Sequence, residues 1–463
     1  MPKPLTDDSD RLPCQGAIVF TRYPQPGQTK TRLIPALGAA GAAELQWQMT
    51  EQTLASFLPL LERKTLQVDV CYTGGTRRQM QRWLGENFTY RSQGTGDLGA
   101  RLTRAFDSAF DRGLERAIAV GIDCPTIDPS TVDKAFEALE NCDLVLGPAV
   151  DGGYYLIGLR RAVPKLFAGI DWGGDRVLAQ TVAAAESLGL SIAYLAPQAD
   201  IDRPEDLAVW EGVLDERDRT QKISAVVPVL NEAPRLKQTL ARLEGACNLE
   251  TIVVDGGSSD NSVAIARAAG AQVLSTAPGR AGQMNAGAKV ATGDILLFLH
   301  GDTQLPSEFD RAIRQYLVNP QTIAGAFELN IEGNLRGLDT IASGTNWRSR
   351  RLQMPYGDQG LFLRTATFEQ MGGFREMPLM EDFEFVRQLK RHGRIAIVPA
   401  AVLVSGRRWQ KLGVWRTTLT NGAIVIAYLL GCPPQWLARW YWGSDGRSNS
   451  RSPQAQPTGN DEP

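Results

Sequence analysis

The sequence predicts an α/β protein with two domains in tandem, each built on a mostly parallel sheet flanked by helices. Its 463 residues are too many for one hydrophobic core and suit two domains of roughly 200 residues. Two apolar runs that read as buried strands, 16–21 and 222–230, each open a stretch in which strand-like and helix-like segments alternate. Acidic residues follow strand-like runs in the same order in both halves. We therefore expect two copies of one fold.

The predicted domains lie between two tails and are separated by a short linker. Residues 1–13 and 443–463 are polar and have no apolar pattern, which is typical of disordered segments. The first domain is expected at 14–212 and the second at 222–442, with the highly charged stretch 213–221 between them.

Composition excludes several classes of function. The 49 basic and 51 acidic residues give a net charge of −2, so no strong field favours nucleic acid. The six cysteines include no CxxC pair, which argues against a zinc ribbon or a disulfide scaffold and for a reducing, cytoplasmic compartment. Only two histidines are present, His300 and His392. Chemistry is therefore expected to depend on carboxylates, Arg, Lys and backbone groups.

Near its C-terminus the chain carries one stretch that could meet a membrane. Its apolar run at 423–430 is far shorter than the ~20 residues of a membrane span. Aromatic residues and Arg439 follow it up to residue 442. We expect 423–442 to form a helix that packs on its own domain or rests on the inner face of the cell membrane as a peripheral contact.

The second half contains strand-like runs that end in polar residues. The strand at 222–230 is followed by Glu232, and the strand at 251–254 ends at Asp255. In open α/β sheets ligands bind beyond the carboxyl ends of the strands, so Asp255 is suited to accept hydrogen bonds from a nucleobase or ribose. The alternative is an Asp that caps the next helix, a role that suits Asp260 better.

A basic residue and a metal-binding acid are predicted further along this half. Arg280 and Asn285 are expected on one side of a short helix, where Arg280 either clamps a diphosphate or stays a solvated surface residue. The buried strand at 295–299 ends in His300 and Asp302. A carboxylate there suits a hard divalent cation that carries phosphates, although an ordinary turn with a capping Asp has the same pattern.

Together these motifs resemble the family-2 glycosyltransferases of the GT-A fold. The resemblance spans most of 222–410 and rests on the segments 226–232, 253–260, 280–285, 300–302, 372–374 and 381–385. It implies that Asp255 holds the nucleotide base and that Asp302 carries Mg²⁺ or Mn²⁺ on the diphosphate. It also implies that Asp382, beside Glu381, is the general base of an inverting transfer. His300 replaces the first acid of an Asp-x-Asp turn, and either contacts ribose or phosphate or is a tolerated substitution.

Two further runs extend this resemblance. The run SGRRW is similar to the QxxRW acceptor-loop motif of processive members, with Ser in place of Gln. Arg408 and Trp409 are therefore expected to line the site, and transfer of single sugars is expected. The run YGDQG, which contributes Asp358 and Gln359 as substrate-binding residues, is typical of a narrower subgroup found in arsenosugar-type and radical-SAM-associated gene clusters.

The first half has a polar site of its own. A small basic loop with Lys30 and Arg32 follows the first strand. It suits a phosphate, although its spacing is not that of a P-loop. Three aspartates, each after a strand-like or turn segment, are candidates for the same site: Asp123, Asp151 and Asp202.

Residues 14–210 resemble small nucleotidyltransferases of a GT-A-related fold and, as a whole, the "transferase 1" family. The loop at 30–33 is similar to the K-[ST]-R-L element of those enzymes, and 200–207 to their D-[IV]-D-T-P-E-D-L ending, with Arg203 in place of Thr. In this resemblance Asp123 takes the metal-binding strand end. Three functions remain open for this half: nucleotidyl transfer to a sugar phosphate, a second glycosyl transfer, or ligand binding without catalysis.

For the whole chain we expect a metal-dependent glycosyltransferase that moves a sugar from a nucleotide-sugar donor to a small-molecule or lipid-like hydroxyl acceptor. The first half would then be a nucleotide-binding transferase domain. In one alternative it is a nucleotidyltransferase that makes the activated sugar. The alternative from a different class is a non-catalytic nucleotide-sugar binding scaffold at a membrane surface.

Overall fold

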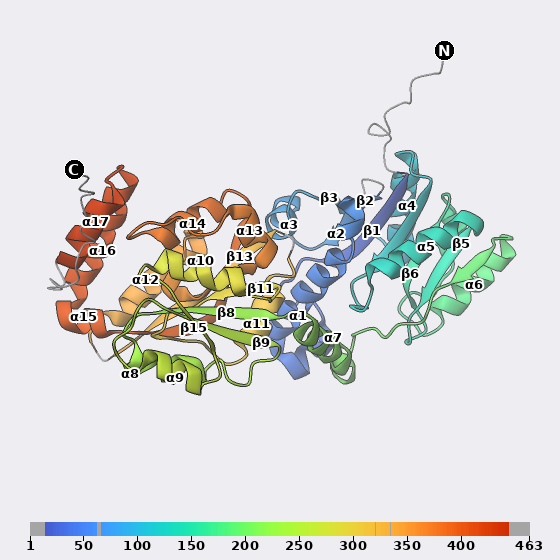
Figure 1. Cartoon of the computed structure of the whole chain (residues 1–463). Coiled ribbons are helices and arrows are strands. Elements are labelled where there is room, and N and C mark those ends of the chain that lie inside the picture. Colours follow the sequence, from blue (N-terminus) through green and yellow to red (C-terminus); the bar gives the residue numbers. More distant parts are fainter. Residues whose placement is uncertain (1–13, 63–65, 320, 334, 444–463) are drawn as a thin grey trace, which may run out of the picture. The chain divides into compact units, whose positions relative to one another are not determined.

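The chain folds into two compact units, described here from a computed structural model (Figure 1). The structure describes residues 14–62, 66–319, 321–333 and 335–443. The predicted tails therefore fall outside the described residues, except for Gly443, which ends the last helix. Unit 1 comprises Met1–Thr220 with Arg314–Thr322, and unit 2 comprises Gln221–Ile313 with Ile323–Pro463.

Unit 1 contains a seven-stranded sheet of order β3-β2-β1-β4-β6-β5-β7. Its strands are β1 (Gln15–Arg22), β2 (Leu66–Thr73), β3 (Thr89–Ser92), β4 (Arg116–Gly121), β5 (Leu144–Pro148), β6 (Tyr154–Leu159) and β7 (Ile192–Tyr194). Only β6 runs antiparallel to its neighbours. The sheet is therefore mostly parallel, as predicted.

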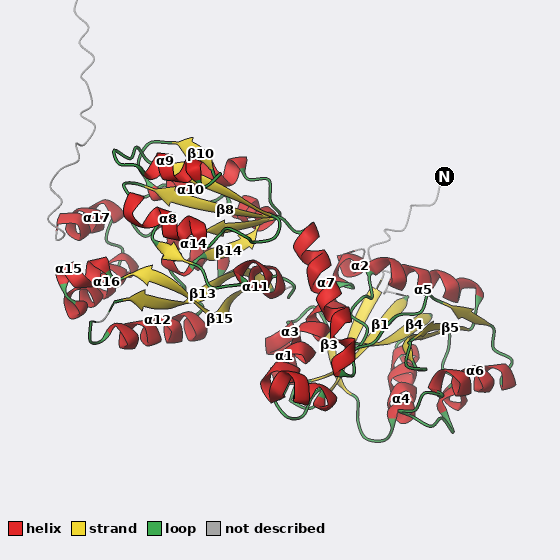
Figure 2. Cartoon of the chain, turned by 90° about the horizontal axis from the view of Figure 1, so that it is seen from below, coloured by secondary structure: helices red, strands yellow, loops and turns green. Residues whose placement is uncertain are grey.

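The helices of unit 1 pack on both faces of this sheet (Figure 2). They are α1 (Ile34–Ala55), α2 (Leu58–Glu62), α3 (Arg77–Leu84), α4 (Leu98–Asp111), α5 (Pro129–Asn141), α6 (Val177–Ser187) and α7 (Leu207–Thr220), with short 3₁₀ turns η2 (Thr31–Leu33), η3 (Pro164–Phe167) and η4 (Pro204–Asp206). Alternate residues of β1 enter two separate cores, Val19 with α1 and α5, and Ile18 with α4. The stretch predicted as a linker, 213–221, lies mostly inside α7.

Unit 2 contains an eight-stranded sheet of order β10-β9-β8-β11-β14-β13-β15-β12. Its strands are β8 (Ile223–Val229), β9 (Leu249–Asp255), β10 (Gln272–Ser275), β11 (Ile295–Phe298), β12 (Thr303–Gln304), β13 (Thr322–Glu332), β14 (Leu361–Arg364) and β15 (Arg394–Ser405). The first four in this order are parallel, and β14 is antiparallel to β11. Two α/β units with flanked sheets confirm the predicted fold class.

Helices flank the second sheet as well. They are α8 (Ala233–Ala241), α9 (Ser262–Ala268), α10 (Arg280–Val290), α11 (Phe309–Tyr316), α12 (Leu338–Leu352), α13 (Thr365–Met371) and α14 (Glu381–Leu389), with a 3₁₀ turn, η5 (Gly357–Gln359). The core between α10, α14 and the sheet holds Phe298, Phe374 and Phe385, and the rings of Phe374 and Phe385 lie 4.5 Å apart. This packing fixes the start of α14 against the sheet.

Three further helices follow in the described part of unit 2: α15 (Arg407–Leu412), α16 (Val414–Leu429) and α17 (Pro434–Gly443). The last two, α16 and α17, pack against α14. Among the described residues, no helix has the length and apolar character needed to span a bilayer. The helix predicted at 423–442 is in fact the second half of α16, a turn, and α17.

Candidate functional site

Three parallel strands bring the predicted polar residues of unit 2 to one edge of its sheet. The central strand β8 pairs with β9 at Val229 and Asp255, and with β11 at Val226 and Phe298. Because parallel strands end at the same edge, the segments that follow them lie side by side. These segments carry Glu232, Asp255, His300 and Asp302.

Asp255 lies at the end of β9 and is 4% exposed. Its carboxylate accepts hydrogen bonds from the backbone N–H groups of Gly257 (3.0 Å) and Ser258 (3.1 Å). Gly257 has φ +92, a conformation that favours glycine. The turn is therefore organised by the Asp255 side chain, which keeps a carboxylate at the strand edge.

An arginine that the sequence did not single out joins the acids at this edge. The Nη2 of Arg407, at the start of α15, donates to Glu232 Oε2 at 2.7 Å and to Asp302 Oδ2 at 3.4 Å. Its pKa is raised, because hydrogen bonding and attraction to Glu232 and then Asp302 outweigh the effect of burial. Arg407 thus balances the charge of the two carboxylates.

The predicted base lies at the N-terminus of α14, facing η5. Asp382 Oδ2 accepts from the Gly357 N–H at 2.7 Å, and Oδ1 accepts from the Phe383 N–H at 2.7 Å. A Cβ atom built on Gly357 would lie 2.9 Å from Asp382 Oδ2 and 3.1 Å from His300 Nε2. No side chain fits there, so Asp382, Gly357 and His300 converge on one spot.

A second carboxyl group, Asp358, sits beside this spot. Burial and then the Asp382 carboxylate raise the pKa of Asp358 to about 6, and the charge of Asp302 acts in the same direction. Its Oδ1 is buried and, among the described residues, has no hydrogen-bond partner. A buried oxygen without a partner costs free energy and marks a position that a ligand can satisfy.

Arg280 and His300 complete the charged cluster. Arg280 Nη1 lies 3.3 Å from Glu381 Oε1; the arginine side chain is 50% exposed and that of Glu381 only 5%. Burial and then the charge of Arg280 lower the pKa of His300 well below its ordinary value. His300 is therefore neutral at pH 7 and can both donate and accept a hydrogen bond.

Of four other residues predicted to bind substrate, Asn285, Gln359 and Arg408 make contacts inside the protein. Asn285 donates to the Phe374 carbonyl at 2.8 Å and accepts from the Phe374 N–H at 2.9 Å. Gln359 is fully buried and donates to the Phe327 carbonyl at 2.8 Å. The Arg408 guanidinium lies 3.6 Å above the Tyr441 ring, and Trp409 Nε1 is buried with no hydrogen-bond partner within the described part of the chain. Their substrate-binding roles stay predictions, and the contacts of Asn285 and Gln359 favour a structural role.

The donor set at the edge of unit 2 suits a hard divalent cation. In the parts of the chain that the structure describes, no group of three or more His, Cys, Asp or Glu side chains forms a ready metal site. Carboxylate oxygens are nevertheless the ligands that Mg²⁺ and Mn²⁺ prefer. Asp302 and the partnerless Oδ1 of Asp358 provide them. These residues fit a cation that a phosphate-bearing ligand brings with it.

Unit 1 has two cavities, one of ≈ 620 Å³ along α4 and one of ≈ 530 Å³. The second is lined by all the site residues predicted in this half, which are Lys30, Arg32, Asp123, Asp151 and Asp202. In the second, Lys30 Nζ donates to Asp123 Oδ1 at 2.6 Å and to the carbonyl of Ile201, and lies 3.3 Å from Asp202 Oδ1. Arg32 Nη1 donates to Asp202 Oδ2 at 3.0 Å. Asp123, predicted as a metal ligand, is therefore paired with a lysine.

Two further aspartates line the same cavity of unit 1. Asp151 accepts a hydrogen bond from the Gly153 N–H at 2.8 Å. Burial and then the Asp151 carboxylate raise the pKa of Asp200. The sequence motif at 200–207 contains Asp200, but only Asp202 was selected from it. Lys30 itself has a left-handed backbone, with φ 46 and ψ 45, which directs its side chain onto the aspartates.

Each unit matches a known protein family. Residues 57–174 match the family described as "Uncharacterized protein conserved in bacteria (DUF2064)". Residues 224–375 match the family "Glycosyl transferase family 2", which covers β8 to the end of α13 and includes the edge with Asp255 and Asp302.

Individual proteins resemble parts of the chain. An undecaprenyl-phosphate 4-deoxy-4-formamido-L-arabinose transferase of Yersinia enterocolitica is 34% identical over 108 residues, which is 20% of this chain and 33% of that protein. A Yersinia pestis protein of the same description is 29% identical over 157 residues, 31% of this chain and 48% of that protein. The chain thus spans a third to a half of the length of these relatives.

Solved structures also resemble the chain. That of a candidate nucleotide-diphospho-sugar transferase from Desulfovibrio desulfuricans G20 is 34% identical, covers 42% of this chain and 85% of its own, and has a TM-score of 0.40. Glucosyl-3-phosphoglycerate synthase from Mycobacterium tuberculosis, in complex with Mn²⁺, UDP and glucosyl-3-phosphoglycerate, is 20% identical, covers 48% and 83%, and has a TM-score of 0.35.

Proposed function

Because residues 224–375 match the family "Glycosyl transferase family 2", we propose that unit 2 transfers a sugar from a nucleotide-sugar donor to a hydroxyl group of an acceptor. The observation that carries the proposal is the convergence of Asp382, His300 and Asp358 beside the strand ends that hold Asp255 and Asp302.

In this proposal the donor lies along the strand edge. Asp255, at the end of β9, receives the nucleoside through hydrogen bonds to base or ribose. Arg280 is half exposed and lies where it can exchange its contact with Glu381 for a bidentate contact with the diphosphate. The two ends of the donor are thus fixed before transfer, which lowers the entropic cost of reaching the reactive geometry.

A divalent cation, Mg²⁺ or Mn²⁺, would be held by Asp302, with Asp358 beside it. When bound, it would neutralise the charge that develops on the leaving diphosphate. Arg407 shares its guanidinium between Glu232 and Asp302, so it balances the charge of these two acids.

In the transfer step, Asp382 accepts the proton of the acceptor hydroxyl group. Its carboxylate takes the proton of the acceptor O–H while the acceptor oxygen forms a bond to the anomeric carbon. The bond from that carbon to the phosphate oxygen breaks, and its electron pair leaves with the nucleoside diphosphate. Attack opposite to the leaving group inverts the configuration. The hydrogen bonds from Gly357 and Phe383 orient the Asp382 carboxylate for this role.

The acceptor is proposed to be lipid-borne. The matched transferases of Yersinia are described as acting on undecaprenyl phosphate, and aromatic side chains lie next to Asp382, with the rings of Phe383 and Tyr428 5.8 Å apart. The subgroup of arsenosugar-type clusters remains a proposal that rests on the YGDQG run alone.

A second activity is proposed for unit 1, because its cavity combines cations for phosphate with four acids. Lys30 and Arg32 would bind the phosphates of a nucleoside triphosphate or sugar phosphate. Asp123, Asp151, Asp200 and Asp202 line the same cavity and, although they form no ready metal site among the described residues, offer carboxylate ligands to a cation that the phosphates bring. Pyrophosphate release from a nucleoside triphosphate and a sugar phosphate tests this nucleotidyl transfer. If no such pair of substrates yields pyrophosphate, the cavity serves another function.

A binding screen tests the donor assignment. Thermal shift and calorimetry of the full chain with UDP- and GDP-sugars, each with Mn²⁺, should identify a donor whose binding weakens at least tenfold in EDTA. Asp302→Asn should reproduce that loss with the metal present. Asp260→Asn, which changes an acid that accepts hydrogen bonds from Ala233 and Ser262 at the starts of α8 and α9, should leave donor binding unchanged. Equal donor affinity in Asp302→Asn and the natural protein would contradict the metal assignment.

A further inference from the structure

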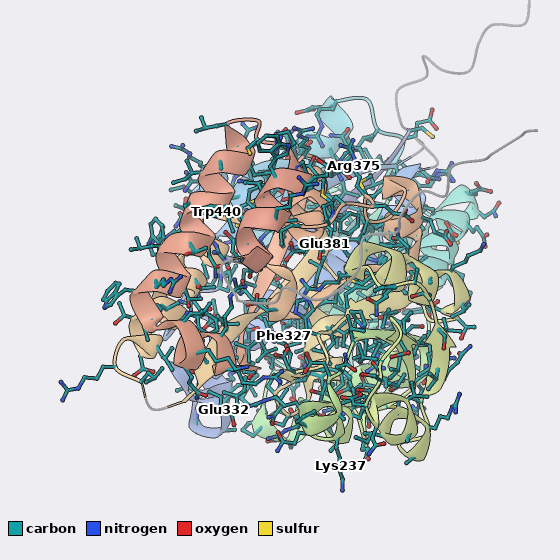
Figure 3. All side chains as sticks on the ribbon, turned by 60° about the vertical axis from the view of Figure 1, so that its left-hand side comes forward. Lys237, Phe327, Glu332, Arg375, Glu381 and Trp440 are labelled. Atoms are coloured by element: carbon teal, nitrogen blue, oxygen red, sulfur yellow. The ribbon has the colours of Figure 1, made fainter. Side chains whose placement is uncertain are left out.

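The last two helices of unit 2, with the turn between them, form what we call the C-terminal hairpin: α16, residues 430–433 and α17. It lies outside the segment that matches the glycosyltransferase family, which ends at residue 375. Figure 3 labels Trp440 on this hairpin and Glu381 at the start of α14. The hairpin has one face that is packed and one that is not.

The packed face of the hairpin lies against α14. Ile424 of α16 and Leu437 of α17 are 2% exposed and share a core with Met380 and Phe383. Tyr428 donates a hydrogen bond from its hydroxyl to Glu384 Oε2 at 3.0 Å. Since Phe383 directly follows Asp382, the hairpin is fixed to the element that carries the proposed base.

The opposite face of the hairpin is apolar and exposed. On α16 the exposed residues Trp415, Leu419, Gly422, Ile426 and Leu429 recur every three or four positions, which places them on one side of the helix. The exposed fractions are 71% for Leu419, 70% for Trp415, 60% for Ile426 and 57% for Leu429 on α16, 83% for Leu430 in the turn, and 68% for Trp436 and 48% for Trp440 on α17. Isolated exposed apolar residues are common, but a stripe of four large apolar side chains along α16, together with two exposed tryptophans on α17, marks an interaction surface.

The charge of this region identifies the partner. Between residues 406 and 443 the sequence contains five basic residues and no Asp or Glu: Arg407, Arg408, Lys411, Arg416 and Arg439. The last three are exposed. The chain as a whole carries a net charge of −2, so basic charge is concentrated here. Tryptophan with Lys and Arg beside an apolar helix face is the composition that binds the interface of an anionic bilayer.

We propose that the C-terminal hairpin docks the protein onto an anionic phospholipid surface and thereby brings a lipid-borne acceptor to Asp382. The helix α16 lies in the plane of the interface and does not cross the bilayer, in keeping with its 16 residues. The stripe enters the acyl region, Arg416 and Arg439 of the hairpin and Lys411 of the neighbouring α15 meet lipid phosphates, and the packed face holds α14 at the surface. The part of this inference that concerns the acceptor rests on the proposed glycosyl transfer; the docking itself does not.

Co-sedimentation with vesicles tests the docking. The full chain should bind vesicles of phosphatidylglycerol and phosphatidylethanolamine at least tenfold more tightly than vesicles of phosphatidylcholine, and 0.5 M NaCl should weaken the binding. The triple variant Trp415→Ser, Leu419→Ser, Ile426→Ser should lose at least nine-tenths of the binding. The matched control is Trp347→Ser, which removes a tryptophan of unit 2 that is 61% exposed but lies on α12; it should bind as the natural protein does.

Further measurements separate the alternatives. Lys411→Glu with Arg416→Glu should weaken anionic binding without touching the stripe. An unchanged donor-induced thermal shift in both variants shows that unit 2 is folded and that its nucleotide site is independent of docking. Failure of the full chain to bind anionic vesicles, or equal binding by the triple variant, would overturn the proposal. A concentration-dependent dimer that the triple variant abolishes, without any vesicle binding, would assign the stripe to a second copy of the chain.

Discussion

At the scale of single residues, Arg407 is the cation that pairs with two acids of the candidate site, Glu232 and Asp302. Asp255, Asp302 and Asp382, predicted because each follows a strand-like run or opens a helix-like one, stay predicted site residues. The sequence could not predict that Arg407 and not Arg408 contacts Glu232 and Asp302. Which of the two adjacent arginines faces these two acids depends on where α15 begins. Gly406 precedes the first residue of α15, and a Cβ atom built on it would overlap the Glu332 carbonyl oxygen.

The two arginines give a matched pair of variants. Arg407→Ala should lower kcat/KM at least tenfold, because Glu232 and Asp302 lose the cation that balances their charge. Arg408→Ala removes a guanidinium that stacks on Tyr441 and should change kcat/KM less than threefold. Steady-state kinetics with the identified donor would decide; the reverse order of effects would support the prediction, made from the SGRRW run, that Arg408 lines the site.

The raised pKa of Asp358 predicts that the stability of the fold depends on pH. An unfolded Asp loses its proton near pH 3.9, whereas the pKa of Asp358 in the fold is about 6. Between these values the folded state holds the proton more tightly, so stability falls as pH rises from about 4 to about 6 and the loss persists above. The free energy of unfolding lost in this way is at most about 3 kcal/mol, because the pKa of Asp358 differs by about two between the folded and unfolded states.

Asp358→Asn should therefore raise the Tm measured in EDTA at pH 8 by several degrees, and change it little at pH 4. Circular-dichroism melting at the two pH values checks this sign. A variant that is less stable than the natural protein at pH 8 would mean that the ionised Asp358 is satisfied in the fold.

At the scale of elements, the order of strands and helices was predictable, while the short connections were not. Apolar runs mark β8, β9 and β11, and the parallel arrangement follows from the alternation with helices. The turn η5 has no comparable pattern. Gln359 and Asp358 are neighbours in sequence, yet Gln359 is buried among Phe327 and Ser349 and Asp358 faces the acids. Only the packing of η5 distinguishes the two.

The same turn yields a test by substitution of one glycine. In Gly357→Ala the new methyl group would lie 2.9 Å from Asp382 Oδ2 and 3.1 Å from His300 Nε2, so the Asp382 carboxylate, the His300 ring or η5 must shift. Because Asp382 is the proposed base, we expect its displacement to lower the rate by about tenfold. Gly344→Ala in α12, where nothing lies within 4 Å, should retain full activity and be as stable or slightly more stable. Full activity of Gly357→Ala would show that the exact position of Asp382 is unimportant.

At the scale of the whole molecule, the repeated strand-end acids correctly predicted two α/β units. The sequence could not show that the predicted linker is mostly helical, nor that α16 and α17 form a hairpin with one exposed apolar face. Both features depend on tertiary packing. The helix α7 extends through the predicted linker because its apolar residues pack on unit 1. The hairpin forms because Ile424 and Leu437 pack on α14.

Two separate sites predict separable functions. Lys30→Ala removes the cation that bonds Asp123 and Asp202 in unit 1, and should abolish binding of phosphate-bearing ligands there. Release of nucleoside diphosphate by unit 2 should stay within twofold of the natural protein when the donor is supplied. Calorimetry and a coupled assay on the same preparations make the comparison. Loss of both functions in Lys30→Ala would contradict independent sites.

The central claim is that unit 2 transfers a sugar with Asp382 as the base. The most direct measurement is the rate of nucleoside diphosphate release from the donor found in the binding screen, with Mn²⁺ and acceptor present, by the natural protein and by Asp382→Asn. The account predicts a fall of roughly 10²- to 10⁴-fold with donor affinity unchanged. Equal rates in the two proteins would contradict it.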